Sequence, residues 1–187
     1  MSEWREANGE SNNPSFATLV IGLGNPLRGD DGVGCRMVEE LARRELPPGV
    51  QVPDGGAGGL GLLNLMEGWE CVVIVDAAEM GRRPGEFARF TPADVRLASA
   101  SDRFSLHHAG LSEALTLADA LGRALPEMVI FGVQTVGVGW GEGLSPAVEA
   151  ALPALIATAV VFFPISCKTG EGVQEWVDWL VERCRAG

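Results

Sequence analysis

Short apolar runs alternate along the chain with segments of helical periodicity, and this alternation restricts the fold more than any other feature. Apolar runs rich in β-branched residues are typical of buried strands, and helices between them favour parallel strand pairing. The strands that we expect are Ala17 to Leu23, Val50 to Pro53, Cys71 to Asp76, Gly85 to Phe90 at an edge, and Met128 to Thr135. The sequence therefore predicts a three-layer α/β fold with a mostly parallel twisted sheet flanked by helices.

Between these strands, apolar residues recur at helical spacing. Val33, Met37, Val38 and Leu41 share one face of an amphipathic helix. The other helices that we expect are a short one from Gly58 to Met66, one after His107 that ends before Pro126, and a buried one from Ala147 that runs on into a strand by Phe163. The segment from Ala93 to Arg103 has no clear period and is expected to be a surface loop.

One domain accounts for most of the chain, because 187 residues with 47% hydrophobic content can bury one substantial core. We assign residues 16–160 to this α/β domain. Residues 1–15 are polar, lack the features of a secretory signal, and are expected to be a disordered leader. Residues 161–187 are expected to form a tail of strand, turn and helix, with an apolar helical stripe from Val173 to Cys184.

The overall charge restricts the partners. A formal net charge of -11 argues against nucleic acid, because binding to phosphates needs a cationic surface. The four cysteines are widely spaced and form no zinc or redox pair, which indicates reduced thiols in a cytoplasmic protein. The longest apolar stretch contains Glu149 and Pro153 and is too short for a membrane span.

The glycine-rich segment from Gly22 to Gly34 is not expected to bind a nucleotide. Leu27 occupies the position of the third glycine of a dinucleotide fingerprint. Asp30 and Asp31 stand where a phosphate-binding loop would have a lysine and a hydroxyl residue. Two carboxylates at a helix start would repel a phosphate, so no nucleotide cofactor is predicted.

Asp31, Asp76 and His107 each lie where a predicted strand passes into a loop or helix. Such strand ends converge at one edge of an open parallel sheet, so these three side chains could share a ligand. We expect Asp30 to cap the helix that follows it and Asp31 to point outward from the first turn. Two carboxylates and an imidazole suit a divalent ion with open coordination positions.

Such an ion polarises a carbonyl group and lowers the pKa of bound water, which is hydrolytic chemistry. The catalytic candidates are therefore Asp31, Asp76 and His107, with Asp30 as the candidate for proton transfer. A serine or cysteine triad is less convincing. Cys35 falls within the first predicted helix, and the chain contains no Gly-x-Ser-x-Gly elbow.

Several motifs resemble, in order and spacing, those of the hydrogenase maturation proteases. They are Gly22-Leu23-Gly24-Asn25, Asp30-Asp31-Gly32-Val33-Gly34, Asp54-Gly55-Gly56, Val75-Asp76-Ala77, Ser105 to Leu111, Gly132-Val133-Gln134 and Gly143-Leu144-Ser145-Pro146. The resemblance runs from about Ala17 to about Ala159. It departs at Ala57, where the family usually has threonine, and at His108, which adds a second imidazole beside His107.

The resemblance implies an endopeptidase of aspartic or metallo type that removes the C-terminal peptide of a nickel-iron hydrogenase large-subunit precursor. It also implies that nickel belongs to this substrate and is recognised by Asp31, Asp76 and His107, with His108 as an alternative ligand to His107. Two other functions remain open from the residues: a non-catalytic assembly factor that binds the nickel-loaded precursor, and a metal-assisted hydrolase of another small amide or ester.

The tail resembles a different protein family. Phe163 to Gly172, followed by Trp176 and Trp179, is similar to the end of the GTPase that inserts nickel into hydrogenases. No phosphate-binding loop is present in the chain, so nucleotide hydrolysis does not follow. The tail could add to the sheet, bind another maturation factor or be the remnant of a fusion.

Overall fold

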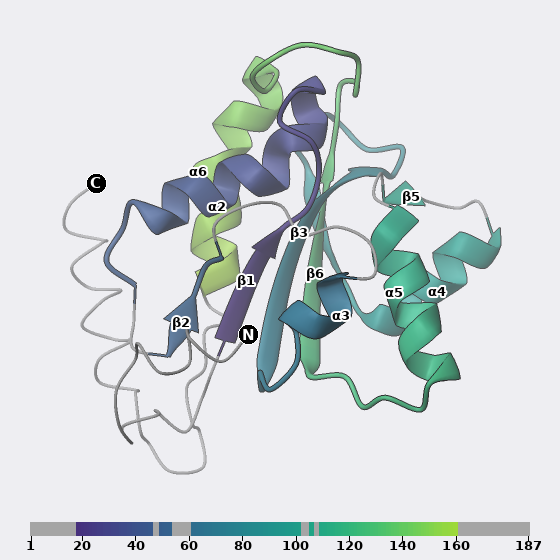
Figure 1. Cartoon of the computed structure of the whole chain (residues 1–187). Helices are drawn as coiled ribbons and strands as arrows, with labels where there is room; N and C mark the ends of the chain where they lie inside the picture. The colour runs from purple at the N-terminus through teal and green to yellow at the C-terminus, as the bar shows by residue number, and fades with distance from the viewer. Residues whose placement is uncertain (1–17, 47–48, 54–60, 102–104, 107–108, 161–187) are drawn as a thin grey trace.

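The computed structural model describes residues 18–46, 49–53, 61–101, 105–106 and 109–160. These residues form one sheet with helices on both of its faces (Figure 1). The strands are β1 (Thr18–Gly22), β2 (Val50–Gln51), β3 (Cys71–Glu79), β4 (Phe87–Phe90), β5 (Ser105–Leu106) and β6 (Glu127–Gln134). The helices are the 3-10 helix η1 (Gly29–Gly32), α2 (Val33–Ala42), α3 (Gly61–Leu65), α4 (Pro92–Ser101), α5 (Ala109–Ala120) and α6 (Pro146–Val160).

The main path of the sheet has the order β2-β1-β3-β6-β4. β1 pairs in parallel with β2 and with β3, and β3 pairs in parallel with β6. β4 lies at the edge and is antiparallel to β6, while β5 is antiparallel to the end of β3. The mostly parallel α/β sheet expected from the sequence is therefore confirmed, and so is the edge position of the fourth strand.

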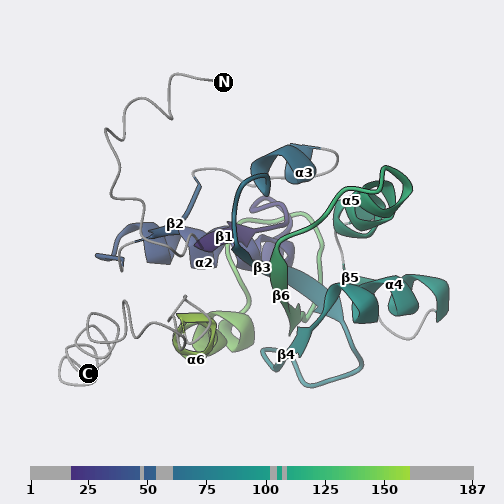
Figure 2. The same ribbon diagram turned by 90° about the horizontal axis from the view of Figure 1, so that it is seen from below.

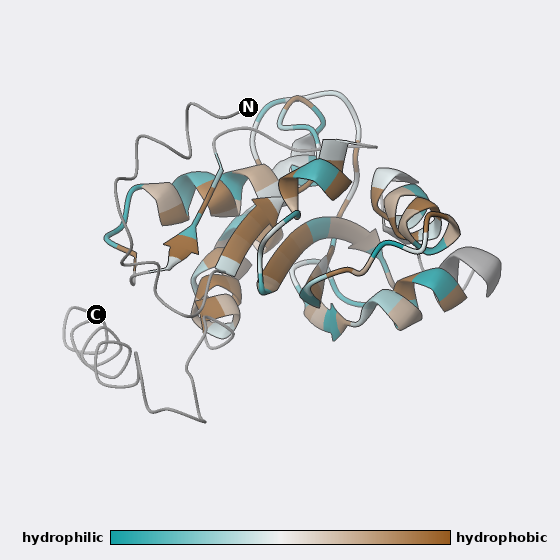
Figure 3. Cartoon of the chain, turned by 60° about the horizontal axis from the view of Figure 1, so that its bottom comes forward, coloured by the Kyte–Doolittle hydropathy of each residue, from teal (hydrophilic) through white to brown (hydrophobic). Residues whose placement is uncertain are grey.

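The core consists of two apolar layers, one on each face of the sheet. Val73 and Val75 of β3 face the layer that α2 and α6 complete, whereas Val72 and Ile74 face the layer of α3, α4 and α5. Figure 2 shows the helices on either side of the sheet, and Figure 3 shows that the central strands are almost entirely hydrophobic. Burial on both faces explains why these strands are continuous apolar runs rather than alternating ones.

β3 is longer than predicted. It continues past Asp76 to Glu79, because β6 pairs with it as far as Ala78 and β5 pairs with Ala78 and Glu79. Asp76 therefore lies inside a strand rather than at the end of one.

The prediction of a surface loop at 93–103 is wrong, because α4 covers Pro92–Ser101. Its start is a capping box: the backbone N–H and the hydroxyl group of Thr91 donate to Asp94 Oδ2 at 2.8 and 2.7 Å, and Asp94 N donates to Thr91 Oγ1 at 3.2 Å. Pro92 occupies the first helical position, where its missing N–H costs nothing. Val95 is buried in the core and holds the helix against the sheet.

Several predicted features lie outside the described residues. They are the leader at 1–15, the glycine cluster from Gly55 to Gly59, both histidines, and the tail at 161–187. Among the described helices, none combines the length and the apolar character needed to cross a membrane.

Candidate active site

The site lies where β1 stops and β3 continues. Gly22, the last residue of β1, pairs with Val75, and the Leu23 N–H donates to the Val75 carbonyl at 2.8 Å. Asp76 is the first residue of β3 beyond this pairing, and its side chain is fully buried. β1 therefore no longer pairs with β3 at Asp76. The β1–α2 loop begins at this point.

The β1–α2 loop turns back on itself and carries Asp31 toward the end of β1. Gly24 has a φ of +118°, and a Cβ atom there would lie 1.7 Å from the Asp31 carbonyl oxygen, so only glycine fits. The Asn25 N–H donates to Asp31 Oδ2 at 3.0 Å. Asp31 is only 3% exposed. The expectation that it points outward is therefore wrong, because the loop folds over its carboxylate.

The start of α2 packs directly on the ends of the two strands. A Cβ atom on Gly34 would lie 2.4 Å from both the Val75 and the Leu23 carbonyl oxygens. This close approach of backbones requires glycine at position 34. It also places η1, which carries Asp30 and Asp31, in contact with β3.

Cys35, in the first turn of α2, lies in acidic surroundings. Burial raises the pKa of its thiol most, and the negative charges of Glu39, Asp31 and Asp76 raise it further. Its Sγ atom also donates to the Gly24 carbonyl oxygen at 3.5 Å. The carboxylates of both aspartates thus act on one thiol at the start of α2, and η1, which carries Asp31, contacts β3, which carries Asp76. We call these two residues the aspartate pair.

The third predicted ligand, His107, lies outside the described residues, as does His108. β5 ends one residue before it, at Leu106, which pairs with Ala78 of β3. Ala78 is two residues beyond Asp76. Within the described part of the chain, no group of three or more histidine, cysteine or acidic residues could hold a metal ion.

Asp30 does not cap the following helix, as the sequence suggested. The cap position of α2 is Gly32, and no side chain bonds to the helix start there. Instead, the Asp30 carboxylate reaches the loop between β6 and α6 and is 2% exposed. Oδ1 accepts the Ser145 N–H at 2.6 Å, and Oδ2 accepts the Val136 N–H at 2.8 Å and the Ser145 hydroxyl at 3.0 Å. Asp30 thus fastens this loop to the loop that carries Asp31.

The sequence motifs contained Gln134 and Ser145, but their roles appear only in the structure. The buried Gln134 carboxamide oxygen accepts the Met80 and Arg82 N–H groups at 2.7 and 3.1 Å, so it holds the turn that follows β3. Ser145 directly precedes Pro146, the first residue of α6. A serine before a proline is a common helix start, and this signal could have drawn attention to it.

Comparison with known proteins assigns the chain to a family. The sequence model of the hydrogenase maturation proteases, described as HycI, matches residues 35–161, which is more than half of the chain. The chain therefore belongs to the hydrogenase maturation protease family. It is an endopeptidase, and thus a hydrolase.

Several relatives agree with this assignment. The chain is 37% identical over 133 residues to the hydrogenase expression/formation protein HupD of Bradyrhizobium diazoefficiens, which covers 70% of this chain and 69% of the relative. It is 34% identical over 140 residues to the hydrogenase 2 maturation protease of Escherichia coli, covering 73% and 85% of the two chains. Its fold is similar to that of the hydrogenase maturating endopeptidase HybD of E. coli, with a TM-score of 0.69, 28% identity, and 78% and 91% coverage.

Proposed function

We propose that this endopeptidase, which cleaves the C-terminus of the large subunit of a nickel-iron hydrogenase, recognises its precursor through the nickel ion that the precursor carries. The observations that support this proposal are the burial of Asp31 and Asp76, which are 45 positions apart in the numbering, and the contact between η1 and β3, the two elements that carry them. Two neighbouring carboxylates in a poorly solvated place repel each other, and a divalent cation removes that repulsion.

The proposed arrangement has the aspartate pair and His107 as ligands of the substrate's nickel. β5 ends at Leu106, beside the end of β3, so the chain continues toward position 107 from this edge of the sheet. His108 remains the alternative imidazole. Because the ion would also keep ligands from the precursor, a protein set of two carboxylates and one imidazole leaves coordination positions open.

Binding of the nickel would place the scissile peptide next to a polarising ion and a water molecule. The water oxygen adds to the peptide carbonyl carbon, and the proton that it loses passes to the leaving amine. Asp30 was our candidate for this proton transfer. Its two oxygens accept three hydrogen bonds from Val136 and Ser145, which favours a positioning role for Asp30 instead.

The test uses nickel-loaded and nickel-free precursor, with the products weighed by mass spectrometry. We expect cleavage of the nickel-loaded form only. Asp31→Asn, Asp76→Asn and His107→Gln should each abolish cleavage while the circular dichroism spectrum stays unchanged, because each replaces one proposed ligand by a neutral amide of similar size. Asp119→Asn, which alters the ion pair between Arg96 of α4 and the exposed Asp119 of α5, is the matched control and should cleave normally.

Two outcomes would contradict the proposal. Normal cleavage by all three site variants would eliminate the site. Equal cleavage of nickel-free precursor would eliminate recognition through the metal. Binding of the precursor without any change in its mass would instead support the assembly-factor alternative.

For the tail, we propose an interaction with another maturation factor in the cytoplasm, on the basis of its sequence similarity to the nickel-insertion GTPase. Trp176→Ala and Trp179→Ala in the full chain should weaken capture of the nickel-insertion GTPase, because tryptophan side chains often dominate such contacts. Cleavage of isolated precursor should stay the same. Unchanged capture by both variants would rule this role out.

A further inference from the structure

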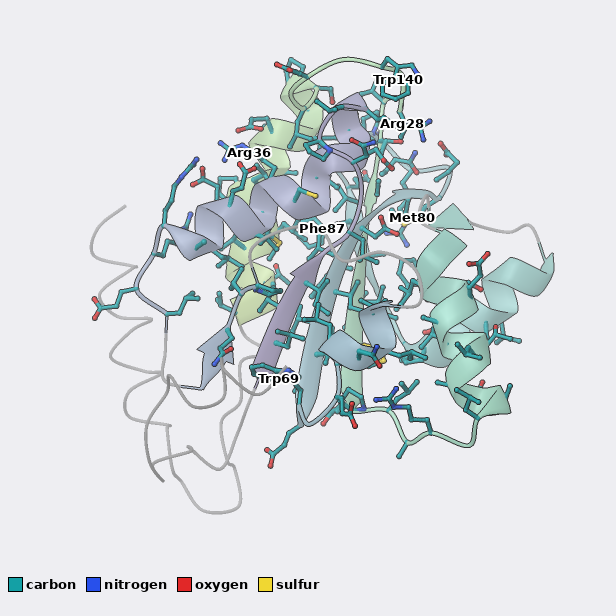
Figure 4. All side chains as sticks on the ribbon, viewed as in Figure 1. Arg28, Arg36, Trp69, Met80, Phe87 and Trp140 are labelled. Atoms are coloured by element: carbon teal, nitrogen blue, oxygen red, sulfur yellow. The ribbon has the colours of Figure 1, made fainter. Side chains whose placement is uncertain are left out.

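Three large apolar side chains are exposed together at the end of the molecule that carries the aspartate pair. Leu27 is 51% exposed, Val136 is 64% exposed and Trp140 is 83% exposed. Leu27 belongs to the β1–α2 loop, while Val136 and Trp140 belong to the β6–α6 loop. With the exposed Arg28 they form what we call the Trp140 surface. Figure 4 shows Trp140 and Arg28 at the same end of the molecule, opposite to Trp69.

The two loops of this surface are fastened to each other along their backbones. Arg28 forms a parallel bridge with Gly141, in which the Gly29 N–H donates to the Gly141 carbonyl at 2.8 Å and the Gly141 N–H donates to the Leu27 carbonyl at 3.0 Å. These bonds hold Trp140 beside Leu27 and Arg28. The exposed side chains therefore stand on a braced backbone, which lowers the conformational entropy that a partner must remove on binding.

The buried carboxylate of Asp30 adds a second fastening. It accepts hydrogen bonds from Val136 and Ser145, which lie at the two ends of the β6–α6 loop. Asp30 directly precedes Asp31 in the β1–α2 loop. The β1–α2 loop therefore carries both Asp31 and part of the Trp140 surface, and Asp30 fixes it to the β6–α6 loop. A chain segment whose nickel lies at the aspartate pair would run next to this surface.

The charge of the surface indicates what kind of segment it fits. The protein has a net charge of -11, yet none of the ion pairs among the described residues involves Arg28. The arginines at positions 36, 43, 96 and 123 are paired. The exposed Arg82 and Arg83 are, like Arg28, in none of these ion pairs, but they follow β3 and lie outside the two loops of this surface. An exposed, unpaired arginine beside an exposed tryptophan is typical of a protein-binding surface. It suits a segment with a large apolar side chain and a carboxylate.

We propose that the Trp140 surface binds the hydrogenase large-subunit precursor, through a segment near the cleavage site that carries an apolar side chain and an acidic group. This inference rests on the proposed function. It adds a second contact, independent of nickel, that determines how tightly the protein substrate is held.

The test compares the kinetics of Trp140→Ala and Arg28→Glu with those of the wild type on nickel-loaded precursor. We expect KM to rise roughly tenfold for Trp140→Ala, with kcat nearly unchanged, because an exposed side chain contributes to binding and not to the chemical step. Arg28→Glu should raise KM similarly, and its effect should shrink at high salt because the contact is between charges.

Leu121→Ala is the matched control. Leu121 is also an exposed apolar residue, at 65%, but it follows α5 and lies outside the two loops of the Trp140 surface. Its KM should equal that of the wild type. Normal kinetics for both Trp140→Ala and Arg28→Glu, with cleavage by the wild type, would overturn this inference alone. Absence of cleavage by the wild type would overturn the proposed function and this inference with it.

A second copy of the chain is the other occupant to be considered. If Trp140→Ala converts a dimer to a monomer in size-exclusion chromatography and leaves KM unchanged, the surface is a contact between copies and the proposal is wrong. A single elution volume for both proteins together with a raised KM supports binding of the precursor.

Discussion

Single residues at this site are held by their partners, and Asp30 is the clearest example. A buried carboxylate needs hydrogen-bond donors, and Asp30 has three, from Val136 and Ser145. Its neighbour Asp31 accepts a hydrogen bond from the Asn25 N–H. Two adjacent acidic residues in the sequence therefore have different surroundings. The Asp30 carboxylate braces the β6–α6 loop, and the Asp31 carboxylate bonds within its own loop.

Asp30→Asn tests this difference. An amide group presents one NH2 group to donors that need an acceptor, so at least one buried donor loses its partner. We expect the free energy of unfolding to fall by about 1–3 kcal/mol in urea denaturation. Asp31→Asn serves as the comparison and should be less destabilising. A normal stability for Asp30→Asn with complete loss of cleavage would favour proton transfer over bracing.

Among the elements, α4 is the one that hydrophobic periodicity missed. Its apolar pattern is weak, with Val95 as its deeply buried residue, so the helix depends on its capping box more than on an apolar face. The hydrogen bonds from the Thr91 side chain and backbone lower the pKa of Asp94 below its ordinary value. A lowered pKa in the folded state means that the carboxylate form stabilises the fold.

Thr91→Ala should therefore lower the thermal midpoint at neutral pH, because it removes two of the three capping contacts. The stabilisation by ionised Asp94 is present above its ordinary pKa and is lost as the pH falls through the lower pKa of the folded state. We expect the difference between the variant and the wild type to shrink below about pH 4, where the carboxyl group protonates. Thermal unfolding at neutral and at acidic pH measures this; a difference that is constant with pH would contradict the role of Asp94.

At the scale of the whole molecule, the important fact is that three separate segments meet at one end of the sheet. The β1–α2 loop brings Asp31, β3 brings Asp76, and the β6–α6 loop is fastened to the β1–α2 loop through Asp30 and Gly141. Cys35 lies at this junction. Burial raises the pKa of its thiol, and the negative charges of Glu39, Asp31 and Asp76 raise it further. Its reactivity is therefore a measure of the tertiary arrangement that does not depend on a substrate.

Asp31→Asn and Asp76→Asn should each accelerate alkylation of Cys35 by iodoacetamide. Removal of a nearby negative charge lowers the raised pKa of the thiol, so more thiolate is present at pH 8. We expect a faster rate in both variants, and peptide mass mapping separates Cys35 from the other cysteines. Asp119→Asn should have no effect. If only Asp31→Asn changed the rate, the two aspartates would not be neighbours.

The sequence by itself determined most of the strand positions and most of the helices, because apolar periodicity is a local signal. The role of the aspartate pair stays a prediction from the sequence. It misplaced the end of β3, the helix α4 and the partner of Asp30. The end of β3 depends on pairing with β5 and β6, and the partners of Asp30 lie more than a hundred positions away. Only the tertiary structure decided these features, since strand register and loop packing arise from contacts that no local pattern contains.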